Sequence, residues 1–149
     1  VPEPELALVM DDTLRLVGLS IGNDVSARDI EGRNPLYLPQ AKVYLGSCAL
    51  GPCVTLFSSL SNPRELAITL DIVRDGSSLF SGSTSTAQLA RSFDELISWL
   101  GRDQRFPNGV VLMTGTGIVP PDEFTLHPGD RVRITIEGLG TLENSVAMS

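Results

Sequence analysis

The chain holds few residues of the kinds that bind zinc, nucleic acids or membranes. Its 149 residues include one histidine, two cysteines and a single lysine, and its net charge is −7. An acidic surface without a basic stripe repels phosphate backbones and anionic lipids, so we expect neither nucleic acid nor a membrane as a partner. No apolar run approaches the roughly 20 residues that a membrane-spanning helix needs. We therefore expect a cytoplasmic protein that acts on a small molecule.

The scarce cysteines and histidine do not form a recognisable chemical site. Four residues separate Cys48 from Cys53 in "CALGPC", and the chain has no second pair to complete a thiolate metal site. A disulfide between them could close only a very tight loop, so we expect two buried free thiols in a reducing cytosol. His127 precedes a Pro-Gly pair in a turn pattern, and we expect it to be structural.

Alternating apolar residues predict that most of the chain forms strands. In the segment 65–74, four apolar residues share one face, and the following Asp75-Gly76 pair is a strong hairpin signal. A buried strand from 109 runs into a glycine-rich bend at 114–117, and an irregular loop is expected at 31–41. The other expected strands cover residues 5–10, 14–22, 53–57, 78–85, 131–138 and 139–146.

One main helix is predicted over residues 85–101. Ser85 and Gln88 fit a capping box at its start, and Gly101 fits a C-terminal stop. The apolar stripe that would pack on the core is formed by Leu89, Phe93, Leu96, Ile97 and Leu100. Without an internal repeat or a linker, the pattern favours a single α+β domain over residues 1–149. It is mostly β, a mixed β-sandwich roll with one main helix.

Acidic residues near the start of the chain are the first candidates for chemistry. Glu3 and Glu5 alternate with prolines in "PEPEL", and proline favours extended backbone at its own position and at the one before it. In an extended chain, residues two apart project to the same side, where two carboxylates repel unless a cation lies between them. A divalent cation is one interpretation, and a solvated acidic segment is the other.

Asp24 could add a third carboxylate to this pair, because it follows an apolar strand at the point where the chain turns. Three carboxylates would make an all-oxygen site, which selects Mg²⁺, Mn²⁺ or Ca²⁺ over zinc. Mg²⁺ keeps several waters, which leaves positions for a substrate. Alternatively, Asp24 is a turn residue that accepts local backbone hydrogen bonds.

Three further residues could bind or transform a substrate near such an ion. Arg28 could grip a carboxylate with its guanidinium, or form a structural ion pair with Asp29 or Glu31. Lys42 is the only lysine, alongside ten arginines. It could act as a base beside a divalent ion, bind an oxyanion as the charged form, or be a surface lysine. Thr116 lies in "TGTG", which could hold a carboxylate or simply form a bend.

In their order along the chain, these motifs resemble the C-terminal domain of the fumarylacetoacetate hydrolase superfamily. The matching segments are "EPELALVM", "GNDVSARD", the lone lysine, "CALGP", "TGTG" and "PGDRVRITIEGLGTLENSV", which cover nearly the whole chain. The resemblance implies the β-sandwich roll of that domain. The residues it assigns are Glu3, Glu5 and Asp24 to the metal, Lys42 to catalysis, and Arg28 and Thr116 to substrate binding.

Two segments, "NPLYLPQAKVY" and "TGTGIVPPDEFTL", resemble the branch of this superfamily that dehydrates 2-keto-3-deoxy-D-arabinonate to 2,5-dioxopentanoate. The implied activity is a Mg²⁺-dependent hydro-lyase that acts on a 2-keto-3-deoxy sugar acid. Members of the superfamily commonly pair, so a homodimer is implied as well. Two alternatives stay open. One is a C–C hydrolase or decarboxylase of fumarylacetoacetate- or acylpyruvate-type diketo acids, and the other is a non-catalytic β domain or an inactive fragment.

One departure concerns the general acid and base. Many members of the superfamily supply a His–Glu pair from a segment that precedes this domain, and His127 does not match that position. The chain also begins two residues before Glu3. We therefore expect a longer protein whose N-terminal segment is not part of this sequence, or a branch that uses other groups.

Overall fold

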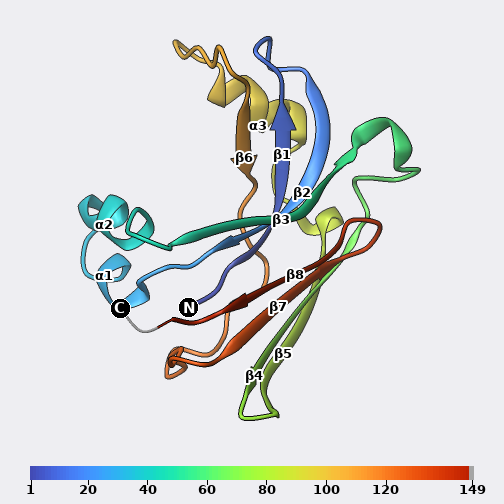
Figure 1. Cartoon of the computed structure of the whole chain (residues 1–149). Coiled ribbons are helices and arrows are strands. Elements are labelled where there is room, and N and C mark those ends of the chain that lie inside the picture. The colour runs from blue at the N-terminus through green and yellow to red at the C-terminus, as the bar shows by residue number, and fades with distance from the viewer. Residues whose placement is uncertain (148–149) are drawn as a thin grey trace.

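Within residues 1–147, which the computed structural model describes, two four-stranded antiparallel sheets form the framework of the fold (Figure 1). The first sheet has the strand order β3-β2-β1-β6, and the second has the order β5-β4-β7-β8. The strands are β1 (Pro4–Met10), β2 (Leu16–Asp24), β3 (Cys48–Leu56), β4 (Ala67–Arg74), β5 (Ser77–Ser85), β6 (Val110–Met113), β7 (Arg131–Ile136) and β8 (Gly140–Ser145). The mostly β fold predicted from the sequence is therefore confirmed.

A single hydrophobic core joins the two sheets, because their strands point alternate apolar side chains inward. The alternation is regular in β7, where every second residue is buried and the residues between are exposed. The core contains Leu6, Leu8, Leu19 and Ile21 from the first sheet and Ile68, Leu70, Ile72, Val132, Ile134 and Ile136 from the second. The shared apolar face predicted for residues 65–74 is thus confirmed in β4.

The hairpin predicted between β4 and β5 is also present. Arg74 pairs with Ser77, so Asp75 and Gly76 are the whole turn. Both have positive φ angles, 49° and 78°, as a two-residue turn that matches the twist of its strands requires.

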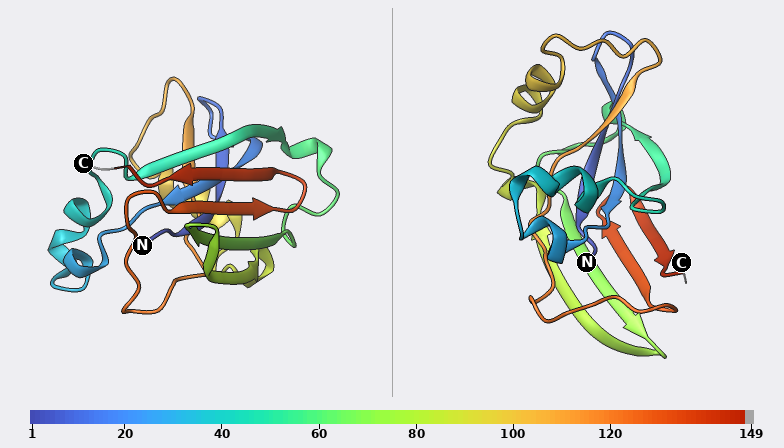
Figure 2. Two further views of the ribbon diagram at one scale, coloured as in Figure 1. Left: turned by 60° about the horizontal axis from the view of Figure 1, so that its bottom comes forward. Right: turned by 90° about the vertical axis from the view of Figure 1, so that its left-hand side faces the viewer.

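Short helices follow β2 and lie beside the N-terminus, as the views in Figures 1 and 2 agree. They are α1 (Arg28–Glu31), the 3₁₀ turn η1 (Pro35–Tyr37) and α2 (Leu38–Lys42). The irregular loop predicted at 31–41 is therefore wrong. Pro35 and Pro39 each lie in the first turn of a helix, where the missing amide proton costs nothing. None of the helices in the described part of the chain is long and apolar enough to cross a membrane.

The main helix is shorter than predicted. It is α3 (Phe93–Leu100), and the segment before it contains only a 3₁₀ turn, η3 (Thr86–Gln88); a further 3₁₀ turn, η2 (Phe57–Ser59), follows β3. Ser92 caps α3 by accepting a hydrogen bond from the amide of Glu95, and Ser85 caps η3 instead. Both serines fit an N-cap, and the prediction that Ser85 caps the main helix is wrong. The predicted stop at Gly101 is confirmed.

The strand β3 differs from expectation in length and in the environment of its cysteines. It runs from residue 48 and includes Pro52, which is tolerated because β3 is an edge strand of the first sheet. Cys48 and Cys53 are both free, as predicted, but both are exposed. The expectation of buried thiols is wrong because an edge strand has one face and one side open to solvent.

Candidate metal and substrate site

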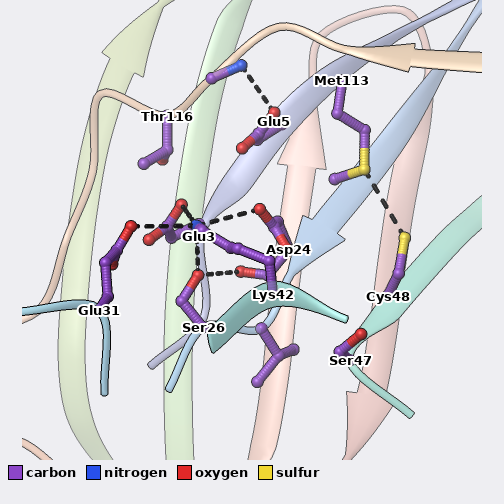
Figure 3. Close-up of polar contacts among 12 residues, drawn as sticks. Glu3, Glu5, Asp24, Ser26, Glu31, Lys42, Ser47, Cys48, Met113 and Thr116 are labelled. Atoms are coloured by element: carbon purple, nitrogen blue, oxygen red, sulfur yellow. Dashed lines mark hydrogen bonds and ion pairs between the residues drawn. The ribbon is translucent and has the colours of Figure 1, made fainter. Parts of the chain in front are cut away.

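Three carboxylates gather where β1 begins and β2 ends. Figure 3 shows Glu3, Glu5 and Asp24 turned toward one another. Each offers one carboxylate oxygen, and these three oxygens lie within 4.8 Å of one another. The structure thus brings together the three residues that the sequence analysis assigned to a metal, and metal binding itself stays a prediction.

The hairpin of β1 and β2 creates this arrangement. Glu5 lies opposite Gly22 in the antiparallel ladder. The backbone amide of Asp24 donates to the carbonyl of Glu3 over 3.0 Å. Because alternate residues of a strand project to the same side, Glu3 and Glu5 point together toward the end of β2. A local backbone pattern therefore places all three carboxylates.

Lys42 lies among these carboxylates rather than on the open surface. Its ammonium donates to Glu3 Oε2 over 2.7 Å and lies 3.0 Å from Asp24 Oδ2. It also donates to the Ser26 hydroxyl, and Glu31 Oε1 lies 4.0 Å from Nζ (Figure 3). The side chain of Lys42 is only 20% exposed, so the interpretation as a surface lysine is wrong.

The short helices after β2 bring Lys42 to this position. Ala41 is fully buried, and its carbonyl accepts a hydrogen bond of 2.9 Å from the backbone amide of Ala27. The amide of Val43 donates to the carbonyl of Pro39 over 2.8 Å and closes α2. The lysine at the end of α2 is thus tied by backbone bonds to the segment that follows Asp24.

Burial and neighbouring charges shift the pKa values of the site. Glu5 is only 4% exposed, and this burial raises its pKa to about 7. The amide of Gly115, which donates to Glu5 Oε2 over 2.6 Å, opposes that rise, while Asp24 and Glu3 add to it. Burial lowers the pKa of Lys42, but hydrogen bonds with Glu3 and Asp24 outweigh this effect and raise it above its ordinary value. Both shifts are upward, so the site favours the protonated forms of Glu5 and Lys42 and attracts cations.

Arg28 and Thr116 direct their polar groups to backbone carbonyls and amides outside the carboxylate trio. The Arg28 guanidinium donates to the carbonyls of Pro120 and Pro121 over 2.7 and 2.8 Å. The Thr116 hydroxyl bonds with the backbone of Ile118, and Thr116 lines a cavity of about 250 Å³. The substrate-binding roles of both residues stay predictions.

Sequence reasoning missed two side chains that contact this site, and it left open whether the "TGTG" segment holds a carboxylate or only forms a bend. In the structure the Gly115 amide of this segment donates to the carboxylate of Glu5. Ser26, the serine of "NDVSARD", is 1% exposed and contacts Lys42, and its position two residues after Asp24 was the available signal. Glu31 was considered only as a partner of Arg28, and in the structure it faces Lys42.

The donor set fits a hard divalent cation. It consists of carboxylate oxygens from three side chains, and Mg²⁺ prefers oxygen ligands while keeping several waters. Two of these carboxylates already hold a cation, the Lys42 ammonium, within hydrogen-bond distance. Mn²⁺ and Ca²⁺ are compatible with the same oxygens.

Comparison with known proteins agrees with this fold. Residues 3–147 match the fumarylacetoacetate (FAA) hydrolase C-terminal family. The chain belongs to this family, as the resemblance of its motifs predicted.

Three similar proteins have names that state a more specific activity than the family name does. A probable 2-keto-3-deoxyxylonate dehydratase of Haloferax volcanii is 50% identical over 146 residues, which cover 98% of this chain and 50% of the relative. The 2-dehydro-3-deoxy-D-arabinonate dehydratase of Saccharolobus solfataricus is 49% identical over 141 residues, 95% of this chain and 47% of the relative. A solved structure of 2-keto-3-deoxy-D-arabinonate dehydratase complexed with magnesium and 2,5-dioxopentanoate is 48% identical, with a TM-score of 0.96 and coverage of 99% of this chain and 52% of that one. The chain spans about half the length of these relatives.

Proposed function

We propose that the full-length protein is a Mg²⁺-dependent dehydratase that converts a 2-keto-3-deoxy sugar acid, 2-keto-3-deoxy-D-arabinonate, into 2,5-dioxopentanoate. The observation that carries this proposal is the convergence of three carboxylate oxygens within 4.8 Å at the end of the β1–β2 hairpin. Sequence identity of about half to two dehydratases of such acids supports this substrate class over fumarylacetoacetate and acylpyruvates.

Glu3, Glu5 and Asp24 would hold the ion. A bound Mg²⁺ would supply Lewis-acid chemistry that makes the C3 protons of a 2-oxo acid more acidic. Lys42 is our candidate for the base that removes a C3 proton, because its Nζ lies beside the same carboxylates. A lysine acts as a base only in its neutral form, and a nearby divalent charge shifts its pKa in that direction.

The overall change balances as the loss of one water. A proton leaves C3 and the C4 hydroxyl leaves as water after taking up a proton, which gives a double bond between C3 and C4. One hydrogen from C5 and one from its hydroxyl are then lost as protons while C3 and C4 each gain a proton, so that C5 becomes the aldehyde. Thr116, which lines the adjacent cavity, is our candidate for binding the substrate carboxylate. The two hydrogen bonds from Arg28 to the 120–121 backbone support a role in positioning the segment that carries Thr116.

Product analysis and calorimetry on the full-length protein test the proposal. Incubation with 2-keto-3-deoxy-D-arabinonate should give a semialdehyde, and incubation with an acylpyruvate should give no pyruvate. Lys42→Ala should abolish turnover and keep Mg²⁺ binding, whereas Glu5→Ala and Asp24→Ala should lose Mg²⁺ binding. Glu123→Ala, at an exposed carboxylate, should change neither property. Pyruvate release would favour the hydrolase alternative, and Mg²⁺ affinity independent of these carboxylates would favour a non-catalytic domain.

We also propose that the protein works as a homodimer in the cytoplasm. The edge strand β3 contains no charged residue and exposes Leu50, Val54 and Leu56 by 48%, 53% and 62%. Such an uncharged apolar edge is suited to contact between two acidic chains. Two free cysteines agree with a reducing compartment. Sedimentation of the full-length protein as a monomer would contradict the dimer.

A further inference from the structure

Lys42 has a second carboxylate neighbourhood in addition to the metal trio. Its Nζ lies 2.7 Å from Glu3 and 3.0 Å from Asp24, and Glu31 Oε1 lies 4.0 Å away. Figure 3 shows Glu31 approaching Lys42 from a different direction than Glu5 and Asp24. Glu31 closes the short helix α1, outside the group of three oxygens that lie within 4.8 Å of one another.

The ammonium and a divalent ion would compete for the same oxygens. Lys42 contacts Glu3 and Asp24, and both belong to the carboxylate trio. A divalent ion among these oxygens would repel a neighbouring ammonium strongly, because charge interactions at such distances stay large even at a high effective dielectric. Binding of Mg²⁺ therefore requires that Lys42 move away from these carboxylates or lose its charge.

Glu31 is placed to receive the displaced ammonium. Its side chain is 37% exposed, so it can adjust its position. Among the ion pairs within residues 1–147, Glu31 pairs with Lys42, while its neighbours Arg28 and Arg33 are engaged with the 120–122 segment and with Asp29. Ser26 also contacts Lys42, but its hydroxyl carries no charge to balance an ammonium.

We propose that Glu31 is a positioning residue that accepts the Lys42 ammonium when Mg²⁺ occupies the carboxylate trio. The inference rests on the proposed metal site. Held by Glu31, the lysine would stay beside the substrate without competing with the ion, and it would act as the base only after the ammonium has given up a proton. Mg²⁺ affinity would then depend on Glu31 only through Lys42.

A double-mutant cycle measured by calorimetry on the full-length protein tests this coupling. Glu31→Gln keeps the shape of the side chain and removes its charge, and it should weaken Mg²⁺ binding by about threefold to tenfold, in the range of a partly exposed ion pair. In a Lys42→Met background, the same substitution should change affinity by less than about twofold. Asp29→Asn, in the same helix and exposed, is the matched control and should also stay below about twofold.

Each outcome separates this inference from the proposed reaction. An equal loss of affinity in both backgrounds would mean that Glu31 acts directly on the ion, and no loss in either would mean that it has no role; both results overturn the inference. If Glu31 and Lys42 show no coupling in Mg²⁺ affinity but the protein still dehydrates the sugar acid, the inference fails and the proposed function holds. If the two residues are coupled but no dehydration occurs, the inference holds and the proposed function fails.

A crystal structure with Mg²⁺ gives a second readout. Lys42 Nζ should lie within hydrogen-bond distance of Glu31, and an ammonium still bonded to Glu3 would contradict the proposal.

Discussion

Replacing Glu5 with glutamine should stabilise the protein in metal-free buffer at pH 8. The Glu5 side chain is buried at 4% exposure, close to two other carboxylates, so its negative charge is costly without a divalent cation. Glutamine has nearly the same shape and can still accept the hydrogen bond that the Gly115 amide now donates to Glu5. The substitution therefore removes the charge with little change in packing.

The expected magnitude follows from the pKa of Glu5. Burial raises this pKa from its ordinary value of 4.5 to about 7 in the folded protein. Between these two values the folded protein binds more protons than the unfolded chain, so the free energy of unfolding falls as pH rises through this window. Each pH unit is worth about 1.4 kcal/mol, so an ionised Glu5 lowers the free energy of unfolding by about 3 kcal/mol at pH 8 and by less than about 1 kcal/mol at pH 5.

Chemical denaturation with EDTA at both pH values measures this difference. Glu5→Gln should raise the free energy of unfolding by about 3 kcal/mol at pH 8 and by much less at pH 5. A weaker hydrogen bond from the Gly115 amide would reduce this gain by about 1 kcal/mol. Glu123→Gln, at an exposed position, should show no such pH dependence. Addition of Mg²⁺ should stabilise the wild type and leave Glu5→Gln unchanged. A gain of equal size at both pH values would refute the role of burial in this prediction.

Three further substitutions test local contacts that support the fold. Gly109→Ala should destabilise the protein more than Gly76→Ala, by at least about 1 kcal/mol in denaturation. Both glycines have a φ near 77°, but a Cβ at Gly109 would lie 2.5 Å from the Met10 carbonyl, whereas the space around Gly76 is open. Arg28→Lys should cost about 1 to 2 kcal/mol, because one ammonium replaces a guanidinium that bonds two carbonyls at once. Equal costs for the two glycines, or an unchanged midpoint for Arg28→Lys, would contradict these expectations.

The strands were predictable because their signal lies in the order of residues. Ile68, Leu70 and Ile72 alternate with more polar residues, and burial of one strand face follows directly from that alternation. The start of α3 was not predictable in the same way, because Ser85 and Ser92 both fit an N-cap and only tertiary packing selects between them.

The candidate site could likewise be predicted only in part from the sequence. The three carboxylates could be assigned from the spacing of Glu3 and Glu5 and from the resemblance that included Asp24. The orientation of Glu31 could not, because it depends on how α1 and α2 fold after β2, a segment for which the sequence predicted only an irregular loop. Its approach to Lys42 became visible only in three dimensions.

The tie between the Glu3 carbonyl and the Asp24 amide has a consequence for how such a protein can diversify. The ligand oxygens come from a rigid two-stranded frame, while the lysine arrives on a separate helical excursion between β2 and β3. The segment with these short helices can be lengthened, shortened or exchanged without changing the β1–β2 hairpin. An engineer who seeks a new substrate should therefore graft residues 28–47 and leave the hairpin untouched.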